Sequence, residues 1–200
     1  MSITALSNHL QNTAGLAARL GSWLIPRQQQ RLSYWVVEQL NVRPYQHLLE
    51  IGYGTGSTLQ QVARRLKIGF LAGIDSSVSM YRQAKRRNEH FIRQELMQLH
   101  IGPVYEMNYP PQYFHTIYGT NVHLRWNDPL QEFFRLFNLL KAGGRMVMIV
   151  QPQSTMSQRE SRTAIERLQE DYLAIGLTDI RIRYQESDAT ACVAISGLKP

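Results

Sequence analysis

Cysteine is almost absent from this sequence of 200 residues, which contains only Cys192. A single cysteine cannot form a disulfide within the chain, and its place in an apolar run predicts a buried strand residue and not a nucleophile. The sequence also has no uninterrupted apolar run near the ~18 residues that span a bilayer, and no basic segment followed by an apolar core at its start. We therefore expect a cytoplasmic protein in a reducing compartment, without a membrane span.

Clusters with metal-ligand spacing are missing as well. The six histidines are dispersed, and no two His or Cys residues lie three or four positions apart, so we expect no metal. Charged residues make up 18% of the chain and hydrophobic residues 44%, which is typical of a packed globular protein. At this length we expect one domain over residues 1–200.

The charge that is present is mainly positive, with a net value of +7. Such a charge favours binding to polyanions. However, the densest basic stretch, Lys85 to Arg87, falls on the face of a predicted helix, where a solvated surface is the commoner interpretation. We therefore disfavour nucleic acid as a partner and keep it as an alternative to a small molecule. No pattern indicates an oligomeric state.

The first 43 residues predict a helical cap, and residues 44–200 predict the core. Apolar side chains between residues 3 and 20 have roughly helical spacing, broken by Gly15. A second helix is expected over residues 28–40, before the turn at Pro44. The cap either packs on the core or closes over a ligand, and the pattern favours neither.

Short apolar runs then alternate with helical patterns. Helices are expected over residues 58–66, 78–88, 129–141 and 158–175, and strands over 47–51, 70–74, 95–101, 114–120, 145–150, 178–184 and 191–196. This alternation predicts an α/β fold with a doubly wound, mostly parallel seven-stranded sheet. The last two predicted strands are joined by too few residues for a parallel crossover, so one strand near the C-terminus must be antiparallel.

Three glycines follow the first predicted strand at alternate positions, Gly52, Gly54 and Gly56. They allow the backbone to turn sharply and to approach a ligand, while the next helix offers free N–H groups to an anion. In a doubly wound sheet, ligands bind beyond the carboxyl ends of the strands. A dinucleotide fingerprint would have its third glycine at position 57, which is Ser57, so the spacing disfavours a nicotinamide oxidoreductase.

The E-x-G-x-G-x-G form of residues 50–56, with Gly73-Ile74-Asp75-Ser76-Ser77 and Lys141-Ala142-Gly143-Gly144-Arg145, resembles the class I S-adenosylmethionine-dependent methyltransferases. The small stand-alone bacterial members are the most similar, and the resemblance extends over about residues 26–150. It implies a Rossmann-like fold and S-adenosylmethionine as the cofactor. The cofactor-binding residues that it implies are Glu50, Gly52, Tyr53, Gly54, Gly56, Asp75, Ser76, Met80, Gly102, Pro103, Val104 and Asn121.

Several of these residues have a second interpretation. Asp75 is positioned to accept hydrogen bonds from both ribose hydroxyls, or it caps the following helix. Glu50 either orders the glycine loop or meets the ammonium group of the cofactor. Ser76 and Met80 lie beside the adenosine in the family, although a Met at helical spacing is commonly plain core.

The sequence departs from the family at two positions. Pro103 stands where the family commonly has an acid that accepts from the adenine amino group, and His115 replaces an aspartate in the fourth strand. Proline has no side-chain acceptor, so a backbone carbonyl, a water or Glu106 would have to take that part. We expect cofactor binding to be weaker as a result.

A dedicated catalytic base is optional, since alignment of the acceptor with the sulfonium can supply ~7–11 kcal/mol. His123 and Tyr53 are weak candidates for a proton acceptor, and a histidine in such a loop is more often structural. Trp126 lines an acceptor pocket or anchors its loop. We expect methyl transfer to a small-molecule, lipid-like or natural-product acceptor. RNA or protein methylation, and cofactor binding without transfer, are the alternatives.

Overall fold

The computed structural model describes residues 27–151, 157–185 and 192–200. The apolar pattern expected over residues 3–20 lies outside this part of the chain. The chain divides into two compact units, residues 1–32 and residues 33–200. Helix α2, Arg27–Leu40, begins in the first unit and continues into the second. The sheet, the remaining helices and the candidate site belong to the second unit.

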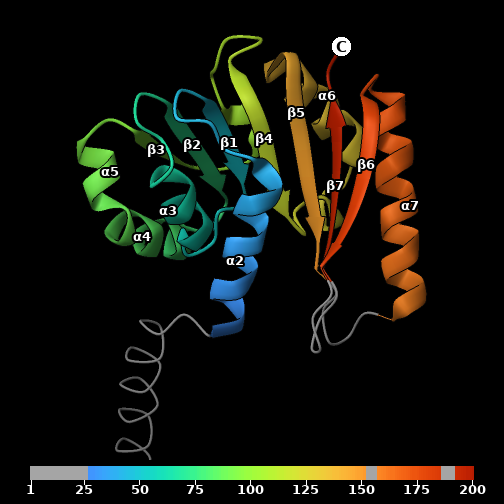
Figure 1. Ribbon diagram of the computed structural model, residues 1–200, viewed down its shortest axis with the longest axis horizontal. Helices are drawn as coiled ribbons and strands as arrows, with labels where there is room; N and C mark the ends of the chain where they lie inside the picture. The colour runs from blue at the N-terminus through green and yellow to red at the C-terminus, as the bar shows by residue number, and fades with distance from the viewer. Residues whose placement is uncertain (1–26, 152–156, 186–191) are drawn as a thin grey trace, which may run out of the picture. The chain divides into compact units, whose positions relative to one another are not determined.

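A seven-stranded sheet in the order β3-β2-β1-β4-β5-β7-β6 forms the centre of the second unit (Figure 1). Neighbours among β1 to β5 pair in parallel, and β7 is antiparallel to both β5 and β6. The predicted fold class, with one reversed strand near the C-terminus, is confirmed. The strands are β1 His47–Ile51, β2 Phe70–Asp75, β3 Met97–Ile101, β4 Phe114–Thr120, β5 Leu140–Val150, β6 Thr178–Gln185 and β7 Cys192–Leu198.

Helices cover the sheet on both faces. The helices of the second unit are α3 Ser57–Ala63, α4 Val78–Arg87, α5 Glu89–Arg93, α6 Pro129–Leu139 and α7 Gln158–Ala174, with the short 3-10 helices η1 Val104–Glu106 and η2 His123–Arg125. On one face, Met146 and Met148 of β5 share a buried core with Phe133 of α6 and Tyr172 of α7. Figure 1 shows α6 behind β5, whereas α3 and α4 lie in front of the sheet.

Local signals in the sequence set several element boundaries. Asp128 caps α6, because its side chain accepts a hydrogen bond from the Gln131 N–H, and Pro129 begins the helix at the predicted residue. Ser157 and Glu160 form a capping box at the start of α7. Gly143, within β5, has a left-handed backbone with a φ of 70°.

Several predicted boundaries were wrong, among them the start of the fifth strand and the ends of two helices. Strand β5 begins at Leu140, where residues 140–144 were expected to finish a helix and turn, because Leu140 pairs with Phe114 of β4. The helix expected through residue 66 ends at Ala63. The helix expected through residue 88 ends at Arg87, where the buried Asn88 side chain donates to the carbonyls of Gly56 and Ala84, and α5 follows.

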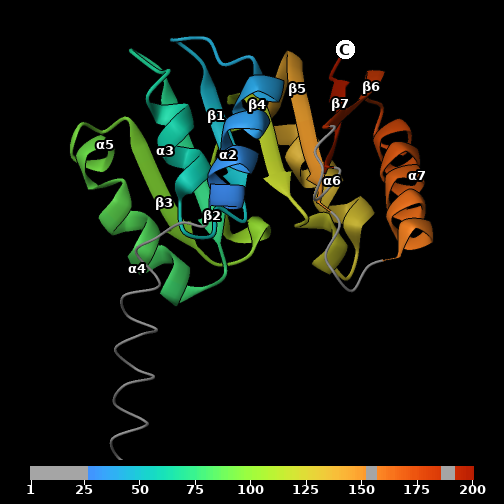
Figure 2. The same cartoon turned by 60° about the horizontal axis from the view of Figure 1, so that its bottom comes forward.

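The carboxyl ends of β1 to β5 meet at one edge of the sheet, which comes forward in Figure 2. Backbone hydrogen bonds extend the pairing by one residue at three strands, from the N–H groups of Gly52, Gly102 and Asn121. These bonds fix where three of the ligand-facing loops begin. The strand order reverses between β1 and β4, which is where a doubly wound sheet binds its ligand. Among the described helices, none combines the length and apolarity that crossing a bilayer requires.

Candidate functional site

The glycine loop after β1 contains three residues in the left-handed region. Gly52, Gly54 and Gly56 have φ values of 69°, 52° and 74°, a region that favours glycine. A Cβ atom on Gly52 would clash with the side chain of Val122, and one on Gly56 would lie 2.8 Å from the Cβ of Ala84. A Cβ on Gly54 would meet no atom of the described residues within 4 Å, its two chain neighbours aside. Gly54 is therefore the loop residue whose backbone borders open space.

Asp75, at the end of β2, is hydrogen-bonded to the glycine loop. Its Oδ2 accepts from the Gly54 N–H at 2.9 Å, and its Oδ1 accepts from the Ser77 N–H at 2.9 Å. Ser77 caps α4, because its hydroxyl accepts from the Met80 N–H. A carboxylate has about four acceptor positions, so Asp75 can still accept from two ribose hydroxyls. The glycine loop and Asp75, which the sequence predicts as parts of one cofactor site, are therefore in direct contact.

Glu50, on β1 just before the glycines, is buried and 5% exposed. Its Oε2 accepts a hydrogen bond from the Tyr118 hydroxyl of β4 at 3.0 Å. Burial raises the pKa of Glu50 well above its ordinary value, the Tyr118 hydrogen bond lowers it, and the nearby Asp75 charge raises it. No ion pair in the described ranges includes Glu50. The site therefore contains a buried acid without a cationic partner.

The side chain of Tyr53 is buried inside the protein. Its hydroxyl donates to the His100 carbonyl of β3 at 2.9 Å, and the side chain is 4% exposed. Burial, with the nearby charge of Asp75, raises the pKa of the Tyr53 phenol. A phenol that is buried, already donating and hard to ionise is a poor proton acceptor. This geometry argues for a packing role.

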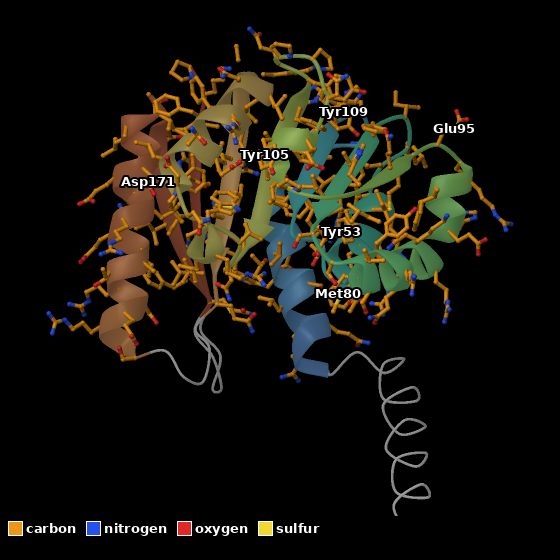
Figure 3. The ribbon with its side chains drawn as sticks, turned by 180° about the vertical axis from the view of Figure 1, so that it is seen from behind. Tyr53, Met80, Glu95, Tyr105, Tyr109 and Asp171 are labelled. Atoms are coloured by element: carbon orange, nitrogen blue, oxygen red, sulfur yellow. The ribbon has the colours of Figure 1, made fainter. Side chains whose placement is uncertain are left out.

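The remaining cofactor candidates from β2 and β3 gather near Asp75. Ser76 is exposed and Met80 is half-buried, and Figure 3 labels Met80 on the same half of the domain as Tyr53. The Gly102 N–H donates to the Asp75 carbonyl, and the Gly102 φ is 137°.

The turn after β3 brings a carboxylate back toward Gly102. Pro103 begins this turn half-buried, and Val104 is buried beneath it. A Cβ atom on Gly102 would lie 2.6 Å from Oε2 of Glu106. The acid that Pro103 lacks is therefore present near the same place, three residues later in the chain.

Asn121, at the end of β4, joins two strand ends. Its amide donates to the Gln151 carbonyl at 2.8 Å, and its Oδ1 accepts from the Gln151 N–H at 2.8 Å. Its backbone lies in the left-handed region, with a φ of 56°. Both functional atoms of the side chain are thus used within the protein, and direct contact with a cofactor stays a prediction.

A cavity of about 780 Å³ lies beyond the end of β4, between η2 and α7. Of the candidate site residues, Asn121 and His123 line it. Trp126 also lines it and packs edge-on against Phe133 of α6 at 5.0 Å between ring centres, which supports the anchoring of its loop, while the acceptor-pocket interpretation stays a prediction. The lining residues are Asn121, His123, Leu124, Arg125, Trp126 and Pro129 on one wall, and Arg159, Glu160, Thr163, Ala164, Arg167, Leu168 and Asp171 from α7 on the other.

Sequence reasoning did not predict that residues of α7 line this cavity. Arg159, Thr163, Arg167 and Asp171 recur every four residues and so share one helix face. This spacing was the available signal, but a polar stripe of this kind is usually a solvated surface. Figure 3 labels Asp171 on α7, on the opposite side of the view from Met80.

His123 is a buried histidine without a hydrogen-bond partner. It is 7% exposed, and neither ring nitrogen has a partner in the described part of the protein. Burial lowers its pKa to about 4. The ring is therefore neutral at neutral pH and offers one donor and one acceptor.

His115 lies away from this site. It is near the amino end of β4, where its Nδ1 accepts a hydrogen bond from the His47 N–H at 3.0 Å. The ligand-facing loops leave the opposite ends of the parallel strands, so the replacement of aspartate by His115 has no direct contact with them. In the described ranges, no three His, Cys, Asp or Glu side chains converge as a metal site would require.

Comparisons with a protein family and with a bacterial protein both show similarity to methyltransferases. Residues 48–144 match the family described as methyltransferase domain. The chain is 26% identical over 182 residues to the uncharacterized methyltransferase YdaC of Bacillus subtilis, an alignment that covers 90% of this chain and 98% of that protein.

Solved structures share the fold. Phosphoethanolamine N-methyltransferase 2 of Haemonchus contortus, in complex with phosphomonomethylethanolamine and S-adenosylhomocysteine, has a TM-score of 0.69 at 15% identity over 85% of this chain. The present chain spans about half the length of that enzyme, 52%. The [4+2]-cyclase SpnF has a TM-score of 0.69 at 16% identity, with coverage of 86% of this chain and 82% of the cyclase. At such low identity these likenesses establish the fold alone.

Proposed function

Since residues 48–144 match the family described as methyltransferase domain, we propose that this protein transfers a methyl group from S-adenosylmethionine to a small-molecule acceptor. The observation that carries the proposal is the 2.9 Å hydrogen bond between the Gly54 N–H and Asp75. This hydrogen bond places the Gly54 backbone, which borders open space, next to the Asp75 carboxylate, to which we assign the ribose. A fold shared with a cyclase would not by itself distinguish transfer from other chemistry.

The residues of the site fit this cofactor. The open space at Gly54 leaves room for the adenosine against bare backbone, and Asp75 has acceptor capacity left for the ribose. Glu50 is an acid without a cation, and the ammonium group of the cofactor supplies one. Glu106 is an acceptor for the adenine amino group close to the turn at Gly102.

When bound, S-adenosylmethionine supplies an electrophilic methyl group on a sulfonium. The protein contributes position, because methyl transfer requires the acceptor atom in line with the departing sulfur. Glu50 and Asp75 hold the two ends of the cofactor, while the side chains after β4 form the surface that faces the acceptor. Tyr53 stays buried and takes no proton.

Replacing Glu50 by glutamine should separate its structural and binding roles. The buried carboxyl has a raised pKa, so the folded protein prefers it protonated, whereas the unfolded chain ionises near the ordinary value. The wild type therefore loses stability as pH rises from that ordinary value toward the folded pKa, by about 1.4 kcal/mol for each pH unit of that interval. We expect Glu50→Gln to be more stable than the wild type at pH 8 and equal to it at pH 4, in unfolding titrations without cofactor.

The same variant should bind S-adenosylmethionine about tenfold more weakly at pH 8, because the ammonium loses its charged partner. Glu89→Gln is the control, since Glu89 forms an exposed ion pair with Arg93 outside the site. Calorimetric affinity that stays at the wild-type value in Glu50→Gln would remove Glu50 from the cofactor site.

The turn after β3 provides a test of adenine recognition. Glu106→Ala should weaken binding of S-adenosylhomocysteine by about fivefold, through loss of one hydrogen bond worth about 1 kcal/mol. Pro103→Asp restores an acid where the family commonly has one, and should tighten binding in the wild type and recover it in Glu106→Ala. Isothermal titration of the three variants gives the answer. Unchanged or poorer binding by Pro103→Asp would contradict this alignment of the turn.

Transfer itself is tested with S-adenosylmethionine labelled in its methyl group. Incubation with panels of hydroxyl, amine and carboxylate acceptors should move the label to a small molecule, at a rate that depends weakly on salt. Label in RNA or protein, with a steep salt dependence, would favour a macromolecular acceptor. Tight cofactor binding without transfer to any acceptor would indicate a binding protein instead.

A further inference from the structure

The cavity between η2 and α7 has an excess of available positive charge. Arg125, Arg159 and Arg167 line it, and none of them belongs to the three ion pairs of the described ranges. Guanidinium groups that line one cavity outside such ion pairs are suited to a carboxylate or phosphate, which they can hold by two parallel hydrogen bonds.

The cavity is also lined by two acids, so its three arginines leave one positive charge in excess. Glu160 is used at the start of α7, where its Oε2 accepts from both the N–H and the hydroxyl of Ser157 at 2.7 Å. Asp171 lies one helical turn beyond Arg167, and burial raises its pKa while Arg167 lowers it. Arg125 and Arg159 have no acid in ion-pair contact within the described residues.

An unsatisfied polar group marks the same cavity from the other wall. His123 lines it, is only 7% exposed, and has no partner for either ring nitrogen among the residues that the structure describes. An unmade hydrogen bond on a buried polar group is unfavourable, so such groups usually have a partner. A ligand in the cavity would provide one. The neutral ring can donate to an oxygen or accept from a hydroxyl or amine.

The cavity is also next to the cofactor loop. Val122 lies between the lining residues Asn121 and His123, and its side chain fills the position that a Cβ on Gly52 would need. Trp126 and Leu168 add apolar surface to the walls. The cavity and the glycine loop therefore both border the short segment of residues 121–123.

We propose that this cavity binds the methyl acceptor, and that the acceptor is a small molecule with an oxyanion group held by Arg159 and Arg167. Its apolar body lies against Trp126, and a polar atom hydrogen-bonds to His123. This inference rests on the proposed function. In the transfer, a lone pair of the acceptor atom forms a bond to the methyl carbon as the sulfur–carbon bond breaks and its electrons stay on sulfur. Any proton on the acceptor atom leaves to water.

The test uses probes in matched pairs and the full chain saturated with S-adenosylhomocysteine. The probes are 4-hydroxybenzoate and 4-hydroxyphenyl phosphate, their uncharged methyl and dimethyl esters, and an aliphatic hydroxy acid with its methyl ester. Binding is followed by the indole N–H signal of Trp126 and the ring signals of His123. We expect at least one anion to bind ten times more tightly than its ester, and the carboxylate and phosphate arms show which oxyanion is preferred.

The variant Arg159→Gln/Arg167→Gln should erase this preference and leave binding of S-adenosylhomocysteine unchanged. Arg162→Gln is the matched control, since Arg162 is an exposed arginine of α7 that does not line the cavity. The inference is overturned if no anion binds, if the esters bind equally well, or if the double variant keeps the preference. Failure of wild-type protein to bind S-adenosylhomocysteine is a different result, which would count against the proposed function.

Discussion

Replacement of Gly54 by valine is expected to weaken binding of S-adenosylmethionine by at least a hundredfold while the protein stays folded. The Gly54 φ of 52° is left-handed, so a side chain there costs about 1–2 kcal/mol, which a domain of ordinary stability tolerates. Apart from its two chain neighbours, no described residue has an atom within 4 Å of the new Cβ, so the side chain enters the space that we assign to the ligand. Isothermal titration and thermal unfolding measure the two effects.

Gly143 provides an unusually close control for this substitution. Its φ is 70°, and a Cβ there would also meet nothing within 4 Å. It lies in the first part of β5, at the edge of the sheet opposite the ligand-facing loops. Gly143→Val should therefore lose similar stability and keep wild-type affinity. Equal affinity in both variants, or equal loss in both, would show that the space in front of Gly54 holds no cofactor.

Replacement of Asp75 by asparagine should weaken cofactor binding by about a hundredfold. Its two oxygens accept from the N–H groups of Gly54 and Ser77, and an amide offers one acceptor and one donor in their place. One backbone N–H then faces an NH₂ group, and the ribose loses a charge-assisted acceptor. Hydrogen bonds to charged groups contribute about 1.5–3 kcal/mol each, and about 2.7 kcal/mol corresponds to a hundredfold change.

The matched control is Asp128→Asn. Asp128 also accepts a hydrogen bond from a backbone N–H, that of Gln131 at 3.0 Å, but it does so as the cap of α6. Asparagine is as good a cap as aspartate, so this variant should bind the cofactor normally. Calorimetry at one salt concentration compares the two. An affinity of Asp75→Asn within threefold of the wild type would leave Asp75 as a purely structural residue.

The sequence predicted features that depend on neighbours along the chain. The strand 114–120 has the predicted bounds, and the Asp128-Pro129 start of α6 was foreseen, because apolar alternation and capping are local properties. The contact between Gly54 and Asp75 followed from topology, since adjacent parallel strands end at the same edge of a sheet. The family resemblance indicated Gly54 and Asp75 as cofactor-binding residues, and the order of the strands places them next to each other.

Features that depend on distant pairing were not predictable in this way. Glu50 and Tyr118 are 68 positions apart, and neither motif nor periodicity indicates their hydrogen bond. The early start of β5 depends on pairing with Phe114, which overrides the helical pattern of residues 140–141. Arg159 and Arg167 of α7 are far along the chain from His123, and only the folded protein brings these residues to one cavity.

The most direct test of the account is isothermal titration of the wild-type protein with S-adenosylhomocysteine, followed by competition with NADH. We predict one binding site per chain, an affinity that falls with Asp75→Asn and Gly54→Val but not with Gly143→Val, and no displacement by NADH. A folded sample that binds neither S-adenosylhomocysteine nor S-adenosylmethionine would contradict the account, as would displacement of the bound molecule by NADH.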